Sequence, residues 1–286
     1  MAIEYVDGFR IFGNDTLIVD NDRILECMDF FKKNHLKKIW ISKFHGYSAT
    51  EIDFLTKFDF LKEIIIKGPF EISGLYALKN LEFLSYENPN PNQVLDLSYF
   101  KEIKTCYLDL KSKVRNLNSL TEVRNLRLFH YTVKEKDLTG LNSLTKLESL
   151  FISISNIESL LGIEALKKLK YIEFHYLRNL TRIEAIASLS NTLEFLMFGS
   201  AKKIVDFEST KSLKKLRTLA FNNCGSIPSI KFIDEMPKLE DFRFVDTNVL
   251  DGGLSPLIRL KYAGFFDKKH YSHTREQIKK HHPPAD

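Results

Sequence analysis

A six-residue phrase of the form apolar-x-x-apolar-x-apolar recurs along most of the chain, and this repetition constrains the fold more than any other feature. Eleven copies occur at an average spacing of about 22 residues. They begin at Leu36, Leu61, Leu81, Ile103, Val123, Leu147, Leu169, Leu193, Leu216, Leu239 and Leu257. A period of this length predicts stacked copies of one structural unit.

Each repeat has two halves with different periods. The phrase alternates between apolar and other residues, whereas the stretch after it carries an apolar residue at every third position, as in Ile157, Leu160 and Ile163. Alternation is typical of a β-strand, and three-residue spacing suits 3₁₀ or extended turns. Because a single coil cannot bury its own apolar face, we expect the coils to stack and their strands to pair in parallel.

The phrase and its spacing resemble the leucine-rich-repeat family, specifically the short repeat LxxLxLxxNxIxxIxxLxx that is found in internalins. The resemblance covers residues 36–262. It implies an α/β repeat solenoid, a leucine-rich-repeat horseshoe with a parallel β-sheet on the concave side and turns, 3₁₀ segments and short helices on the convex side. Family members share a curved binding surface and have diverse partners, so the resemblance implies protein binding but names no partner.

The sequence departs from the family at the turn after each strand, where an asparagine normally satisfies backbone groups. None of the eleven copies has asparagine there. Residues at that position that could replace it are Ser155, Cys224 and Thr247. Asparagines one residue away, which could substitute after a local shift, are Asn88, Asn156, Asn223 and Asn248. Because buried backbone groups must be paired, we expect an irregular solenoid with varied turns.

The two ends of the chain differ from the repeats, and we expect an N-terminal cap over residues 1–35, repeats over 36–262, and a C-terminal cap with a basic tail over 263–286. The N-terminal cap is expected to be a hairpin, with an alternating strand over 3–11 and a second strand over 17–19, followed by a helix that carries Leu25, Met28 and Phe31. Capping-box patterns at 48–51 and 274–277 predict two further helices, the first continuing through Phe58.

The third and fifth positions of each phrase, and the residue directly after the phrase, should face solvent, because side chains alternate along a strand. In the middle repeats these positions carry aromatic residues interleaved with charged ones. The candidate partner-binding residues are Phe83, Tyr107, Arg127, Phe129, Phe151, Tyr171, Glu173, His175, Phe195 and Met197. At about 4.8 Å per strand, six strands span roughly 24 Å, the width of an ordinary protein interface. An aromatic surface of that size typically marks a binding site.

Two other interpretations of these aromatic residues remain open. The rings could cover one another across neighbouring strands and stabilise the sheet without binding anything. Alternatively, a register shifted by one residue would turn every ring into the core, although the agreement of eleven copies argues against such a shift.

The charge of the chain does not require a polyanionic partner. The net charge is +5, from 42 basic and 37 acidic residues. Lysines precede many of the phrases and would follow one rim of the solenoid, which is the strongest argument for nucleic-acid binding. Acidic Asp59, Glu102 and Glu122 share that rim, however, so we expect a protein partner in preference to nucleic acid.

The sequence lacks the short motifs that are typical of catalytic, metal and cofactor sites. It contains no phosphate-binding glycine loop, HExxH or GxSxG pattern, so we expect no catalytic residues, metal or cofactor. The three cysteines are far apart and odd in number, which favours reduced thiols. His270, His273, His281 and His282 gather near the end without a completing carboxylate or cysteine.

The start of the chain carries an acidic residue, Glu4, where a signal peptide would be basic, and no long apolar run follows. We therefore expect a cytoplasmic protein without a membrane segment. We also expect it to be a monomer. An inhibitor or immunity-type protein that masks a toxin or enzyme is one specific form of the protein-binding hypothesis.

Overall fold

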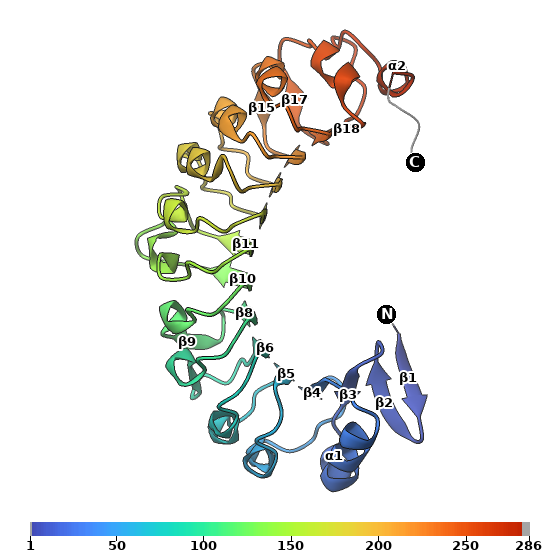
Figure 1. Ribbon diagram of the computed structural model, residues 1–286, viewed down its shortest axis with the longest axis vertical. Coiled ribbons are helices and arrows are strands. Elements are labelled where there is room, and N and C mark those ends of the chain that lie inside the picture. Colours follow the sequence, from blue (N-terminus) through green and yellow to red (C-terminus); the bar gives the residue numbers. More distant parts are fainter. Residues whose placement is uncertain (1, 282–286) are drawn as a thin grey trace. The chain divides into compact units, whose positions relative to one another are not determined.

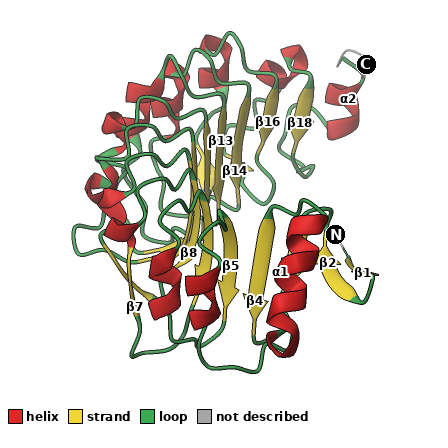
Figure 2. Cartoon of the chain, turned by 60° about the horizontal axis from the view of Figure 1, so that its bottom comes forward, coloured by secondary structure: helices red, strands yellow, loops and turns green. Residues whose placement is uncertain are grey.

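The computed structural model describes residues 2–281, which form two compact units, residues 2–129 and 130–281. In each unit the strands lie side by side on one face and short 3₁₀ helices line the other (Figure 2). The two halves of the predicted repeat, strand and 3₁₀ turn, are therefore confirmed. None of the helices in the described part of the chain is long and apolar enough to cross a membrane.

The sheet of the first unit begins with antiparallel strands and continues with parallel ones. Its strands, in spatial order, are β1 (Ile3–Val6), β2 (Phe9–Phe12), β3 (Thr16–Ile18), β4 (Lys38–Ser42), β5 (Glu63–Lys67), β6 (Phe83–Glu87), β8 (Thr105–Asp109) and β10 (Asn125–Tyr131). Pairing is antiparallel from β1 to β3 and parallel from β3 onward. A separate parallel pair is formed by β7 (Val94–Asp96) and β9 (Lys113–Arg115).

The end of β10 belongs to the second unit, and all described strand pairs of that unit are parallel. The strands, in spatial order, are β11 (Ser149–Ser155), β12 (Tyr171–His175), β13 (Phe195–Gly199), β14 (Thr218–Asn222), β16 (Asp241–Arg243) and β18 (Tyr262–Gly264). A short second pair is formed by β15 (Ser226–Ile227) and β17 (Asn248–Val249). Helix α2 (Arg275–Lys279) follows (Figure 1).

The core of each unit lies between the strands and the 3₁₀ helices. Within the strands, buried and partly exposed residues alternate, as in Tyr171–His175, where Ile172 and Phe174 are fully buried. The 3₁₀ halves add every third residue to the same core, including Ile157, Leu160 and Ile163. Burial of each such side chain stabilises the fold by about 1.5–3 kcal/mol.

The last repeat lies three residues later than predicted. The sequence placed its phrase at Leu257, but Ser255–Arg259 forms a 3₁₀ helix and the strand is Tyr262–Gly264. Tyr262 pairs with Asp241, so the phrase begins at Leu260. Leu257 and Leu260 are both fully buried, because every third residue of the 3₁₀ half also points into the core.

The ends of the chain differ in detail from the prediction. A turn at Asp7 and Gly8, with φ of 49° and 80°, divides the expected first strand into β1 and β2. Helix α1 (Ile24–Lys33) buries Met28 and Phe31, as predicted, but leaves Leu25 69% exposed. It lies beside the first strands of the sheet (Figure 1).

The two predicted capping boxes have opposite outcomes. The pattern at 48–51 precedes only a 3₁₀ helix, Asp53–Lys57, which has no side-chain cap. At the other end Thr274 and Gln277 form the predicted capping box of α2. His282, together with the rest of the predicted tail after residue 281, lies outside the described residues.

Candidate binding surfaces

The outward face of the strands carries all ten candidate residues. They alternate with buried residues along the strands, except that Phe129 is followed by the partly exposed His130, so the register shift that would turn the rings inward does not occur. The first patch, in the first unit, consists of Phe83, Tyr107, Arg127 and Phe129. The second patch, in the second unit, consists of Phe151, Tyr171, Glu173, His175, Phe195 and Met197.

Aromatic and cationic side chains pack against one another across the strands of the first patch. The rings of Phe83 and Tyr107 meet edge to face with their centroids 5.3 Å apart. Arg127 lies over the Tyr107 ring at 5.2 Å, and Lys38 lies over the Phe83 ring at 4.5 Å. These contacts join strands that are well separated in sequence.

The second patch is organised around the carboxylate of Glu173. The hydroxyl of Tyr171 donates a hydrogen bond to one oxygen at 2.9 Å, and Nε2 of His175 lies 2.6 Å from the other. Tyr171 also stacks on Phe195 with centroids 4.2 Å apart, and the ring of Phe151 lies 5.6 Å from His175. The patch therefore combines a fixed acceptor with flat apolar surfaces.

Gly199 allows His175 to take this position. The two residues are register partners on β12 and β13, and a Cβ on Gly199 would lie 2.6 Å from Nδ1 of His175. A larger residue at 199 would therefore push the imidazole away from Glu173.

The aromatic rings of both patches are half-buried rather than fully exposed, because they cover one another. Such cross-strand pairs stabilise a sheet, as expected if the rings serve to cover one another. The rings also keep part of their surface in solvent, beside charged groups. This arrangement is compatible with binding and with stabilisation together.

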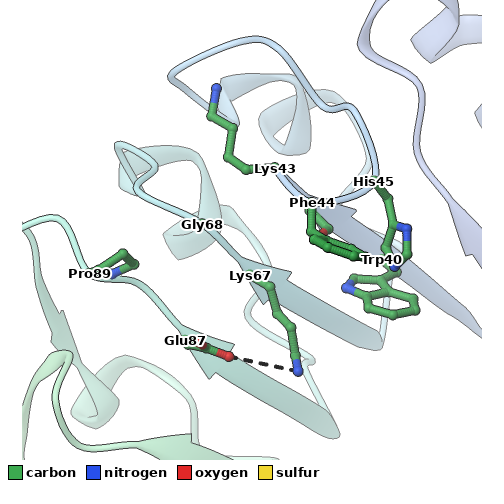
Figure 3. A pocket seen from close by; sticks show the side chains of 9 residues that line it. Trp40, Lys43, Phe44, His45, Lys67, Gly68, Glu87 and Pro89 are labelled. Atoms are coloured by element: carbon green, nitrogen blue, oxygen red, sulfur yellow. Dashed lines mark ion pairs between the residues drawn. The ribbon is translucent and has the colours of Figure 1, made fainter.

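A hollow at the end of β4 contains none of the candidate residues that the sequence predicted. It measures about 440 Å³ and contains Trp40, Phe44 and His45, with the Lys67–Glu87 ion pair opposite (Figure 3). The ring of Trp40 lies 4.3 Å from that of His45, and Phe44 is 91% exposed. The available signal was the single tryptophan of the chain at an outward strand position beside Phe44.

Two buried polar groups in this hollow lack a partner. The indole N–H of Trp40 and the hydroxyl of Ser42 are both buried without a hydrogen bond to any described residue. Unpaired buried donors carry an energetic cost. Burial lowers the pKa of the neighbouring His45, and the charges of Arg10 and Lys67 act in the same direction.

At the edge where the strands begin, next to the predicted lysine rim, carboxylates pair with basic side chains at the second position of the phrases. Glu82 contacts Lys62 at 2.9 Å and Lys104 at 2.5 Å. These two lysines, with Lys104 the stronger, hold the pKa of Glu82 below its ordinary value. In the second unit Glu240 likewise pairs with Arg217 and Lys261. Alternating charge of this kind does not favour a polyanion.

Groups suited to metal binding do not come together in the described part of the chain. No cluster of three histidine, cysteine, aspartate or glutamate residues there could hold a metal ion. All three cysteines are free and buried, and burial raises the pKa of Cys224 to about 12. Buried thiols of this kind carry little thiolate and are poor nucleophiles.

Comparison with solved structures identifies the fold. The chain is similar to an internalin (inlF) from Listeria monocytogenes, with a TM-score of 0.57 and 19% identity over 91% of this chain and 85% of the internalin. It is also similar to internalin C2 from the same organism, with a TM-score of 0.52 and 21% identity over 66% and 82% of the two chains. The sequence matches no protein-family model and no curated protein. The likeness confirms the leucine-rich-repeat fold.

Proposed function

We propose that this chain, which has the leucine-rich-repeat fold, is a non-catalytic module that binds a protein partner on the outward face of its strands. The observation that carries the proposal is the second patch, where aromatic faces surround a fixed carboxylate. Hydrophobic rings with a few oriented polar groups are typical of the centre of a protein interface. The first patch and the Trp40 hollow provide aromatic faces beside charged groups on the other unit.

The proposed setting of this interaction is the cytoplasm, and the proposed form of the protein is a monomer. Three free cysteines buried in the core suit a reducing compartment. The stacked and hydrogen-bonded side chains of the second patch also present a pre-organised surface, which lowers the entropic cost of association.

The first test replaces Phe151 and Phe195 by aspartate in one chain. We expect the double variant to lose its partner in affinity capture from native cytosol, because two charges would be forced into a desolvated contact. Quantitative mass spectrometry of the retained proteins compares it with the wild type. The matched control, Lys168→Ala with Lys215→Ala, makes the same change in net charge at exposed residues away from the patch.

Folding of the double variant must be checked separately, because the Tyr171–Phe195 stack is lost. An aromatic pair contributes about 0.5–1.5 kcal/mol, so the melting temperature should fall by only a few degrees. A variant that remains folded by circular dichroism and still captures the same proteins as the wild type would refute the proposal.

A further inference from the structure

Two adjoining hollows lie at the edge of the second unit where β11, β12 and β13 end. They measure about 450 and 400 Å³ and share Tyr176 and Arg178. We define the edge patch by the six residues of their lining that the argument uses, Ile154, Tyr176, Arg178, Asn179, Lys202 and Lys203. None of these residues belongs to the ten candidates on the outward strand face.

Apolar surface in the edge patch comes from Ile154 and Tyr176. They occupy equivalent positions in neighbouring coils, and both have left-handed backbones, with φ of 59° and 54°. Ile154 is 47% exposed and Tyr176 is 49% exposed. Two large side chains on adjacent coils therefore leave about half of their surface in solvent, beside a hollow that could accept a side chain.

The positive charge of the edge patch is concentrated. Arg178 and Lys202 each lie three residues after the end of a strand, on adjacent coils, and both are exposed. Adjacent parallel strands are about 4.8 Å apart, so the two cations repel each other in the free protein. Among residues 2–281, neither side chain forms an ion pair.

Neighbouring carboxylates do not neutralise this charge. Lys203 donates a hydrogen bond to Asn179 at 3.1 Å, and it attracts Glu158. That carboxylate is already paired with Lys136 at 2.8 Å. The side chains that line the two hollows include no acidic residue. The edge patch thus differs from the opposite edge, where Glu240 lies between two basic residues.

We propose that the edge patch binds an acidic segment of a partner protein. Carboxylates of the segment pair with Arg178 and Lys202, and an apolar side chain beside them packs between Ile154 and Tyr176. Arginine can form a bidentate pair with a carboxylate, through two parallel hydrogen bonds. Tyrosine and arginine are also enriched among the residues that contribute most to binding at protein interfaces. The cations span only two coils, which suits a short acidic segment better than the extended backbone of a nucleic acid.

The test uses synthetic peptides as probes. A blocked Glu-Glu-Phe-Glu-Glu peptide, its Gln-Gln-Phe-Gln-Gln analogue and single-stranded oligothymidylate are titrated against the full chain by calorimetry, at low and at physiological salt. We expect only the acidic peptide to bind appreciably. Arg178→Glu combined with Lys202→Glu should weaken that binding about tenfold or more. The control pair Lys168→Glu and Lys215→Glu makes the same change in net charge and should bind as the wild type does.

Several results would overturn the proposal. They are equal binding of the glutamine peptide, tighter binding of oligothymidylate, unchanged affinity in the charge-reversed variant, or no binding of the acidic peptide at all. Circular dichroism of each variant verifies folding. The Phe151→Asp, Phe195→Asp double variant should retain the acidic peptide, because its changes lie on the strand face. Failure of the strand-face proposal and failure of this one are therefore distinguishable.

Discussion

The second residue after the strand phrase is left-handed in six successive repeats, from the one that begins at Val123 to the one that begins at Leu239. These residues are His130, Ile154, Tyr176, Ser200, Asn223 and Asp246, with φ between 54° and 59°. This conformation occurs near the end of each strand, and it costs an L-residue about 1–2 kcal/mol. Asparagine and aspartate tolerate it best, whereas a β-branched residue such as Ile154 is strained there.

Asp246 provides a clean test of this backbone requirement, because it is exposed. Asp246→Val should lower the free energy of unfolding by about 1–2 kcal/mol, since valine is β-branched and resists a positive φ. Asp246→Gly should cause no such loss. Urea denaturation measures both, with Lys215→Val as the control at an exposed site. Equal losses of unfolding free energy for valine at 246 and at 215 would contradict a requirement for positive φ at Asp246.

Polar residues near the turns replace the missing asparagine, as the sequence predicted. Thr247 donates a hydrogen bond to the carbonyl of Phe221 at 2.6 Å and accepts one from the backbone N–H of Cys224 at 2.9 Å. Ser155 donates to the carbonyl of Tyr131 at 2.5 Å. Chemical type allowed these roles to be predicted. The positions with left-handed backbone could not be predicted from the sequence, because the residues that occupy them share no chemical type.

At the scale of elements, the β7–β9 pair depends on one carboxylate. Asp96 accepts hydrogen bonds from Ser98 and Asn116, and its carboxylate pairs with Arg115 at 2.8 Å. The bonds from Ser98, then Asn116, hold its pKa well below the ordinary range. Its contribution to stability is therefore complete above the unfolded-state pKa of about 3.9 and is lost as the pH falls through the lower folded-state value.

Asp96→Asn should remove this part of the acid sensitivity. The variant should be less stable than the wild type at neutral pH, and the difference should shrink as the pH falls below about 4. Urea denaturation from neutral pH downward gives the two curves. Parallel curves over the whole range would show that the carboxylate of Asp96 makes no pH-dependent contribution.

Periodicity predicted the strands because a strand that is half-buried must alternate. Periodicity failed to place the last strand, because either Leu257 or Leu260 can serve as the first apolar residue of the phrase, and both are buried. It also failed at 48–58, because Ile52 and Leu55 fit the three-residue spacing of a 3₁₀ helix as well as an α-helix. The Asp7-Gly8 turn was visible as a hairpin signal, but the alternation across it suggested one strand.

For the whole molecule, alternation alone identified which side chains face outward, and hence both patches. It could not show that Tyr171 and His175 converge on Glu173, because their side-chain conformations depend on packing, including the space left by Gly199. The Trp40 hollow and the edge patch depend on turns that follow the strands, whose paths have no simple sequence period. Those surfaces are therefore recognisable only in the folded structure.

Hydroxyl-radical footprinting of the chain, free and with its captured partner, tests the central claim most directly. Aromatic and sulfur side chains are measurable by this chemistry. We predict that Tyr171, Phe195 and Met197 lose reactivity in the complex, while the fully buried Phe198 is unreactive in both states. Unchanged reactivity of the three patch residues, with protection confined to other surfaces, would contradict binding on the outward face of the strands.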